Sequence, residues 1–192
     1  MRILLSVLVL ILNLQSWTKA DDIRDFQIEG ISIGDSALDF FSESEIKKNS
    51  QDYFKKKDYT PVENNNMSFF KTYDAVDFIF KTNDKNYIIK SLSGVLNYSN
   101  NIEDCYKKMD EIVSEMDVIF SNQKKNPKET YKHRMDKSGK SKVTDVEYLF
   151  KNGDSAQIAC YDYSVEHGGQ DHLSVAMDDK DIYDFFINNP YN

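Results

Sequence analysis

The two cysteines of this chain, Cys105 and Cys160, constrain its fold more than any other feature. Cys105 belongs to the strongest helical pattern of the sequence, in which apolar residues recur at steps of three and four from Ile102 to Phe120. Cys160 belongs to a segment of alternating apolar residues, which is the pattern of a half-buried strand. An even cysteine count in an exported chain favours a disulfide over two buried free thiols. We therefore expect a Cys105–Cys160 bond that joins a long helix to a sheet through the core.

Residues 1–20 predict a cleaved secretory signal peptide. Arg2 gives a positive start, an apolar run from Ile3 to Leu14 follows, and Ala20 ends a small-residue cleavage site. The competing interpretation is a membrane anchor, but this run is shorter than the roughly 20 apolar residues that span a bilayer. We therefore expect a single domain over residues 21–192, periplasmic or secreted, with no integral membrane span in the mature chain.

The chain is acidic, with 24 Lys and Arg against 32 Asp and Glu and a formal net charge of −8 at pH 7. An acidic surface disfavours nucleic acid and anionic membranes as partners. Clusters of lysine such as Lys55-Lys56-Lys57 and Lys124-Lys125 are interpreted as solvated faces.

Residues 143–163 form the clearest β-hairpin pattern. A two-residue Asn-Gly turn would place Tyr148 opposite Gln157, and the apolar faces of the two strands would disagree. A three-residue loop ending at Gly153 places Tyr148 opposite Ala156 instead, and both apolar sets then share a face. We expect this longer loop, with Gly153 in the left-handed conformation.

The order of patterns along the chain predicts an α+β fold. Further strands are expected over Met67–Thr72, Ala75–Lys81, Tyr87–Tyr98 and Leu173–Met177. Short helices are expected after Asp35 near the start and after Asp178 or Asp179 near the end. The architecture is then an antiparallel sheet with one long amphipathic helix and short terminal helices packed on one face.

The segment before the last strand gathers the polar and aromatic side chains that could form a site. The candidate ligand-binding residues are Tyr161, Asp162, Tyr163, His167, Asp171 and His172. A divalent metal could use His167, Asp171 and His172, but their spacing matches no ligand motif and the intervening glycines favour an exposed turn. No metal is therefore assigned. Tyr161 and Tyr163 could form a binding platform on the sheet, although cross-strand stabilisation is the favoured interpretation.

Motifs of catalysis are not found. There is no Cys-x-x-Cys pair and no Gly-x-Ser-x-Gly, and the Gly-Lys-Ser at Gly139 lacks the earlier glycine of a phosphate-binding loop, where Arg134 stands. No catalytic residue and no cofactor is assigned.

Four stretches carry a resemblance to a known family. They are Phe26–Ser36, Ile102–Lys108, Asp136–Ser141 and Cys160–Asp162. Together they resemble a family of small uncharacterised exported proteins of marine alphaproteobacteria, which implies a periplasmic setting and oxidising conditions for the cysteines. It implies no activity.

The opening Gly30–Ser36 is also similar to openings in small envelope domains of the β-lactamase-inhibitor-protein type, which are helix-plus-sheet binding modules. This chain departs from them because it lacks a lipid-anchor cysteine and has more strand before its long helix. No functional residue is carried over from either likeness.

The leading hypothesis is a non-enzymatic periplasmic protein that binds another envelope protein or a small ligand on its sheet face. The alternative is a periplasmic hydrolase or metal-dependent enzyme with a site near Asp162, His167 and His172. A structural envelope component is a third possibility.

Overall fold

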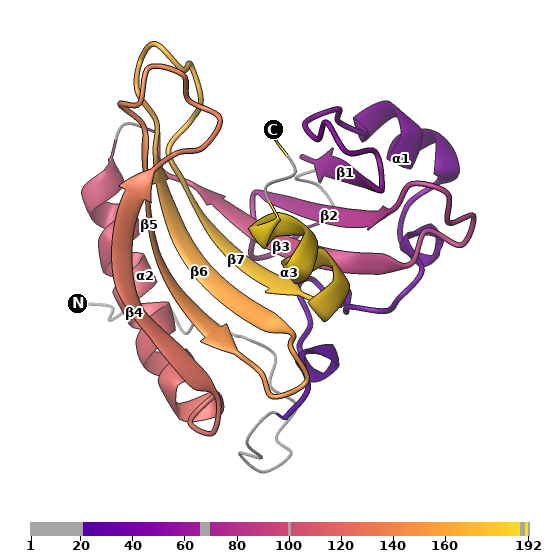
Figure 1. The fold of residues 1–192 in the computed structure, drawn as a ribbon, viewed down its shortest axis with the longest axis horizontal. Coiled ribbons are helices and arrows are strands. Elements are labelled where there is room, and N and C mark those ends of the chain that lie inside the picture. Colours follow the sequence, from indigo (N-terminus) through magenta and orange to yellow (C-terminus); the bar gives the residue numbers. More distant parts are fainter. Residues whose placement is uncertain (1–20, 66–69, 100, 189–190, 192) are drawn as a thin grey trace, which may run out of the picture.

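The computed structural model describes residues 21–65, 70–99, 101–188 and 191. The expected signal peptide, residues 1–20, lies outside them. One seven-stranded antiparallel sheet organises the described residues (Figure 1). Its strands are β1 (Tyr59–Asn64), β2 (Ala75–Lys81), β3 (Ile89–Asn97), β4 (Lys124–Lys132), β5 (Lys142–Leu149), β6 (Ser155–Asp162) and β7 (His172–Asp178). The helices are α1 (Glu43–Asn49), α2 (Ile102–Ile119) and α3 (Lys180–Ile187), with 3-10 turns at Ile23–Asp25 and Ala37–Asp39. The predicted α+β class is confirmed.

The sheet consists of two meanders that meet at its centre. Its spatial order is β1-β2-β3-β7-β6-β5-β4, so the first meander is β1 to β3 and the second is β4 to β7. The last strand, β7, pairs with β3 on one side and β6 on the other. Helix α2 connects the two meanders and covers one face of the second (Figure 1).

The main core lies between the sheet and α2. Cys105, Met109, Ile112 and Met116 form the buried stripe of the helix, as its spacing predicts. The disulfide between Cys105 and Cys160 joins this stripe to β6, which confirms the expected bond. The segment before α1 completes this core, because its buried isoleucines belong to the same apolar cluster.

The hairpin of β5 and β6 has the predicted register. Tyr148 lies opposite Ala156, and Val146 lies opposite Ile158. The connecting loop has three residues, and Gly153 at its end has a φ of 95°.

Helix α3 corrects the expectation that the helices share one face of the sheet. Ile182 and Phe185 of α3 pack with Phe54, Tyr59 and Ile79 in an apolar cluster separate from the main core. In Figure 1, α3 and α2 lie on opposite faces of the sheet. The reason is that α2 and the N-terminal segment already cover the other face. No helix in the part of the chain that the structure describes is long and apolar enough to cross a membrane.

Candidate functional site

The sheet face that carries α3, called the open face below, is mostly polar. Strand registers place one residue from each strand in a row across it. This row is Asn126, Glu147, Gln157, Ala176, Ser93, Asp77 and Glu63. A face that carries carboxylates and amides instead of apolar side chains is not a second core.

Small side chains form the centre of the open face. Ala159 of β6 lies opposite Ser174 of β7, and Ala176 follows two residues later on the same side. All three are buried although they face away from the main core. Because all three are buried, neighbouring side chains of the open face and α3 cover this part of the sheet.

One end of the open face carries five rings, called the ring cluster below: His133, Tyr161, Tyr163, His167 and His172. Tyr161 stacks on His172 with 4.5 Å between ring centroids, and Tyr163 stacks on His167 at 4.6 Å. His133 meets Tyr163 edge-on at 5.1 Å. Stacked and edge-on rings at these separations attract one another, so the ring cluster is a packed aromatic group at this end of the sheet.

Two imidazoles of the ring cluster, those of His133 and His172, favour their neutral form. Burial lowers the pKa of His172, although Gln170, Asp171 and Glu63 act against it. Burial and the neighbouring His167 also lower the pKa of His133. Within the described residues, the buried Nδ1 of His133 has no hydrogen-bond partner. Neutral rings with a spare nitrogen can stack on a ligand and hydrogen-bond to it.

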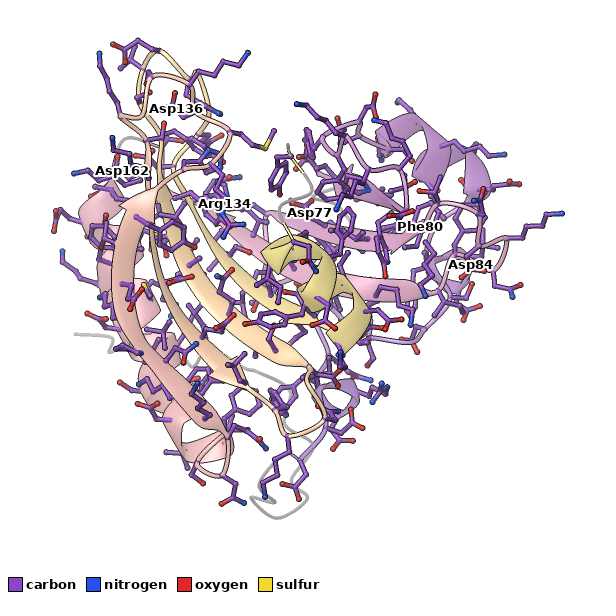
Figure 2. The ribbon with its side chains drawn as sticks, in the orientation of Figure 1. Asp77, Phe80, Asp84, Arg134, Asp136 and Asp162 are labelled. Carbon is purple, nitrogen blue, oxygen red and sulfur yellow. A yellow bond between two sulfur atoms is a disulfide. The ribbon has the colours of Figure 1, made fainter. Side chains whose placement is uncertain are left out.

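The structure brings together four of the six candidate residues that the sequence indicates, namely Tyr161, Tyr163, His167 and His172. Asp162 follows Tyr161 in β6 and so points to the opposite face, and Figure 2 shows it far from Asp77 of the open face.

Asp171 has a structural contact instead. Its carboxylate accepts a hydrogen bond from the backbone N–H of Tyr163 at 2.8 Å, which holds the turn before β7. The fifth ring, His133, was missed because it follows β4, far from the others in sequence. Only the pairing of β4 with β5 brings it to this edge.

Two buried carboxyl groups on the open face have strongly raised pKa values. Burial, with a smaller effect of Glu63, raises the pKa of Asp77 to about 7. Burial likewise raises the pKa of Asp178 to about 7, although Ser91 donates a hydrogen bond to it. Each carboxyl has a buried Oδ1 without a hydrogen-bond partner in the described residues. Raised carboxyl pKa values are frequent at functional sites, but structural burial produces them as well.

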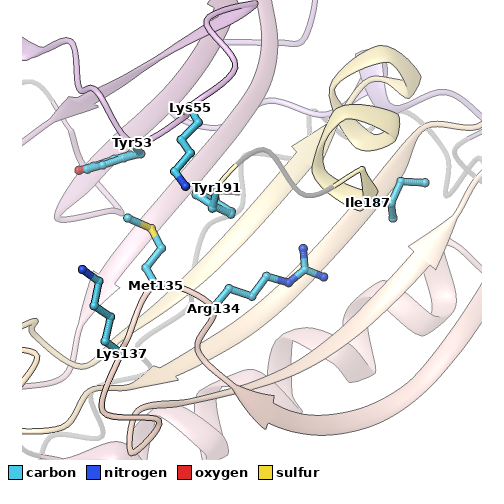
Figure 3. A pocket seen from close by; sticks show the side chains of 7 residues that line it. All are labelled: Tyr53, Lys55, Arg134, Met135, Lys137, Ile187 and Tyr191. Atoms are coloured by element: carbon cyan, nitrogen blue, oxygen red, sulfur yellow. The ribbon is translucent and has the colours of Figure 1, made fainter.

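A pocket of about 760 Å³ opens beside the ring cluster, because His133 of the cluster directly precedes Arg134 of the pocket lining. Figure 3 shows the lining of this pocket. It is lined by Tyr53, Lys55, Arg134, Met135, Lys137, Ile187 and Tyr191. These residues come from the segment before β1, the loop after β4, and the end of α3 with the chain that follows it. The pocket therefore forms only where three distant parts of the sequence meet.

Asp136 holds the loop that contributes three of the seven lining residues. Its carboxylate accepts hydrogen bonds from the backbone N–H groups of Ser138 and Ser141, each at 2.8 Å, and from both hydroxyls. These bonds, those from Ser141 above all, keep the pKa of Asp136 well below its usual range. A loop tied in this way presents Arg134 and Lys137 in a defined position.

No group of three or more His, Cys, Asp or Glu side chains in the described part of the chain is placed to hold a metal ion. Comparison with protein-family models, with curated protein sequences and with solved structures finds no match for this chain. Any function must therefore be argued from the open face itself.

Proposed function

We propose that this chain is an exported, non-enzymatic protein that binds a small ligand on the open face of its sheet. The observation that carries the proposal is the pocket that opens beside the ring cluster. Ligand sites are concave, mostly preformed, and combine apolar or aromatic walls with a few polar groups. The pocket lining combines aromatic, apolar and basic side chains in this way.

The setting outside the cytoplasm is part of the same proposal. It is supported by the signal-peptide pattern of residues 1–20 and by the buried Cys105–Cys160 disulfide, since disulfides persist in oxidising compartments. The likeness to small exported proteins agrees with it.

The alternative hydrolase or metal-dependent enzyme has less support. It needs Asp162 near His167 and His172, and strand alternation directs Asp162 to the other face. A flat aromatic surface would favour a protein partner, whereas a pocket favours a small molecule.

The proposal is tested by altering the open face beside the ring cluster. The protein is produced with export and its disulfide, incubated with the small-molecule fraction of a periplasmic extract, and examined by native mass spectrometry. Ser174→Leu places a larger side chain on the open face, two residues from His172 of the ring cluster. Ser114→Leu is the matched control, because Ser114 is exposed on α2.

We expect the wild type and Ser114→Leu to retain the same bound compound and Ser174→Leu to lose it. Near-ultraviolet circular dichroism confirms that both variants are folded. Equal retention by both variants, or no bound compound on the wild type, would contradict ligand binding on this face.

A further inference from the structure

We infer that the pocket beside the ring cluster binds an amphiphilic organic anion, and this inference rests on the proposed function. The acidic group of the ligand lies at Arg134, and Lys55 and Lys137 add positive charge elsewhere around the pocket (Figure 3). Its apolar body lies against Met135 and Ile187. The shared chemistry is a carboxylate, sulfonate or phosphate on an apolar or aromatic body.

The charge of the pocket carries the first part of the inference. The chain has a net charge of −8, yet no described residue that lines the pocket is acidic and three are basic. Some lysines elsewhere are paired, such as Lys125 with Asp117 at 2.7 Å and Lys128 with Asp110 at 2.7 Å. In the described part of the chain, the three basic groups of the pocket have no carboxylate within ion-pair distance. Positive charges around one pocket that has no acidic lining residue attract an anion.

Arg134 is the group best placed to recognise an acid. One guanidinium nitrogen donates to the carbonyl of Phe186 at 3.2 Å, which directs the side chain across the pocket toward α3 (Figure 3). A guanidinium has five N–H donors in a planar fork, so donors remain for an oxyanion. This fork suits the two oxygens of a carboxylate or the face of a phosphate or sulfonate.

The apolar part of the inference comes from exposure. Tyr53, Met135 and Ile187 are large apolar side chains left 37%, 41% and 59% exposed, and all three line this pocket. Exposed apolar groups gathered at one place mark a binding surface, whereas scattered ones do not. Tyr191 adds a ring that packs on Phe54 with 5.5 Å between centroids.

The walls of the pocket are held in place by contacts within the protein. Asp136 ties the loop that bears Arg134 and Lys137. The hydroxyl of Tyr53 donates to Glu63, which fixes its ring and uses the nearest carboxylate of the open face. A prearranged site loses less entropy on binding, and a volume of about 760 Å³ suits a small organic molecule.

The inference is tested with two fluorescent probes that share their ring system. 8-Anilinonaphthalene-1-sulfonate carries a sulfonate, and N-phenyl-1-naphthylamine is its neutral counterpart. Both are titrated into the folded, disulfide-bonded protein at 50 mM and 500 mM NaCl. The variants are Lys55→Gln, Arg134→Gln and Lys137→Gln. Lys151→Gln is the control, because Lys151 lies in the exposed loop between β5 and β6.

We expect the sulfonate probe to bind more tightly than the neutral probe. Its affinity should fall at 500 mM NaCl, because salt screens the attraction between the sulfonate and the basic side chains. Each pocket variant should weaken sulfonate binding by about threefold to tenfold, while the neutral probe and the Lys151→Gln variant change little. Near-ultraviolet circular dichroism must match the wild type for each variant.

Two results would overturn the inference in different ways. If both probes bind equally and the variants alter neither, the anion preference is wrong while a ligand site on the open face stands. If neither probe binds the folded protein, the inference and the proposed small-ligand function fail together.

Discussion

Tyr161 and His172 lie directly opposite each other on β6 and β7, and their rings stack at 4.5 Å with 17° between the planes. The pair joins two central strands on the open face and leads into the rest of the ring cluster. Its stability depends on the protonation of the imidazole, because a buried cation in this stack loses its hydration.

The first prediction concerns His172. Its pKa is lowered in the fold, so the unfolded chain takes up the proton at a higher pH than the folded protein does. The contribution of His172 to stability is therefore complete above about pH 6.5 and is lost as the pH falls through that value. We expect the imidazole resonances of His172 to titrate below pH 6.5 by NMR.

His172→Gln should reduce the loss of unfolding free energy between pH 7.5 and pH 5.5, measured by urea denaturation. Groups with the opposite pH dependence, such as Asp178, are present in both proteins. Their contribution therefore cancels in the difference between the unfolding free energies of the variant and the wild type. A pKa of His172 at or above 6.5 would contradict the prediction that burial lowers it.

Asp178 gives a prediction of the opposite sign. Its carboxyl has a pKa of about 7 in the fold, above the value of about 3.9 for an unfolded chain. Folding is therefore penalised increasingly as the pH rises from 4 to 7. Asp178→Asn should raise the unfolding free energy by roughly 2 kcal/mol at pH 7.5 and change it little at pH 4.

Urea denaturation followed by circular dichroism at both pH values measures this difference. Asp39→Asn, at an exposed position, is the control and should have no comparable effect. A gain of the same size at pH 4 would show that removing the charge is not the cause.

The disulfide provides a third prediction. Cys105 and Cys160 are 55 residues apart, and closing a loop of this length stabilises by about 4 kcal/mol in the chain-entropy model. Adding a phosphine reductant should lower the urea midpoint by a corresponding amount. The Cys105→Ala/Cys160→Ala double variant should be less stable and insensitive to the reductant. A wild type that unfolds at the same midpoint with its thiols shown to be free by alkylation would refute this.

Gly153 gives a fourth prediction. It ends the β5–β6 loop with a φ of 95°, and an added Cβ would lie 2.9 Å from the side chain of Lys180. Because an L-residue is strained in this conformation, Gly153→Ala should destabilise by about 1 kcal/mol or more. Thermal unfolding measures the change, and Lys151→Ala in the same loop should be close to neutral. If both alanine variants unfold at the same temperature as the wild type, the left-handed conformation of Gly153 does not require glycine for stability.

Strong local periodicity is what made part of this fold predictable. The apolar stripe of α2 and the alternation in β5 and β6 each determine which face is buried. With both faces known, the position of Cys105 opposite Cys160 and the three-residue loop at Gly153 follow. The predictions of the disulfide and the loop depend only on residues close in sequence or on the single pairing of β5 with β6.

The edge strands were not predictable in this way. β4 has the sequence of Lys124–Lys132, which is polar on both faces, and its register shifts around Pro127. β1 contains Pro61, which a central strand would not tolerate. Both lie at edges of the sheet, where charge and proline prevent further pairing. The expected strand at Met67–Thr72 is only partly within the described residues, and the described part of it is not a strand.

Helix α1 had a local signal that was overlooked. Ser42 and Glu45 form a capping box at its start, a pattern visible in the sequence. The candidate site is different, because its cations come from three parts of the chain. Lys55 was interpreted as part of a solvated face, and nothing near it in sequence shows that Arg134 lies across the same pocket.

The place of β7 at the centre of the sheet sets an order of events for the growing chain. The strand that joins both meanders is the last one made, so the sheet stays in two separate parts until residues 172–178 have emerged. Pairings between segments distant in sequence form slowly. Each meander can form from segments that follow one another along the chain, but the two become one sheet only when the strand that lies between them has been made.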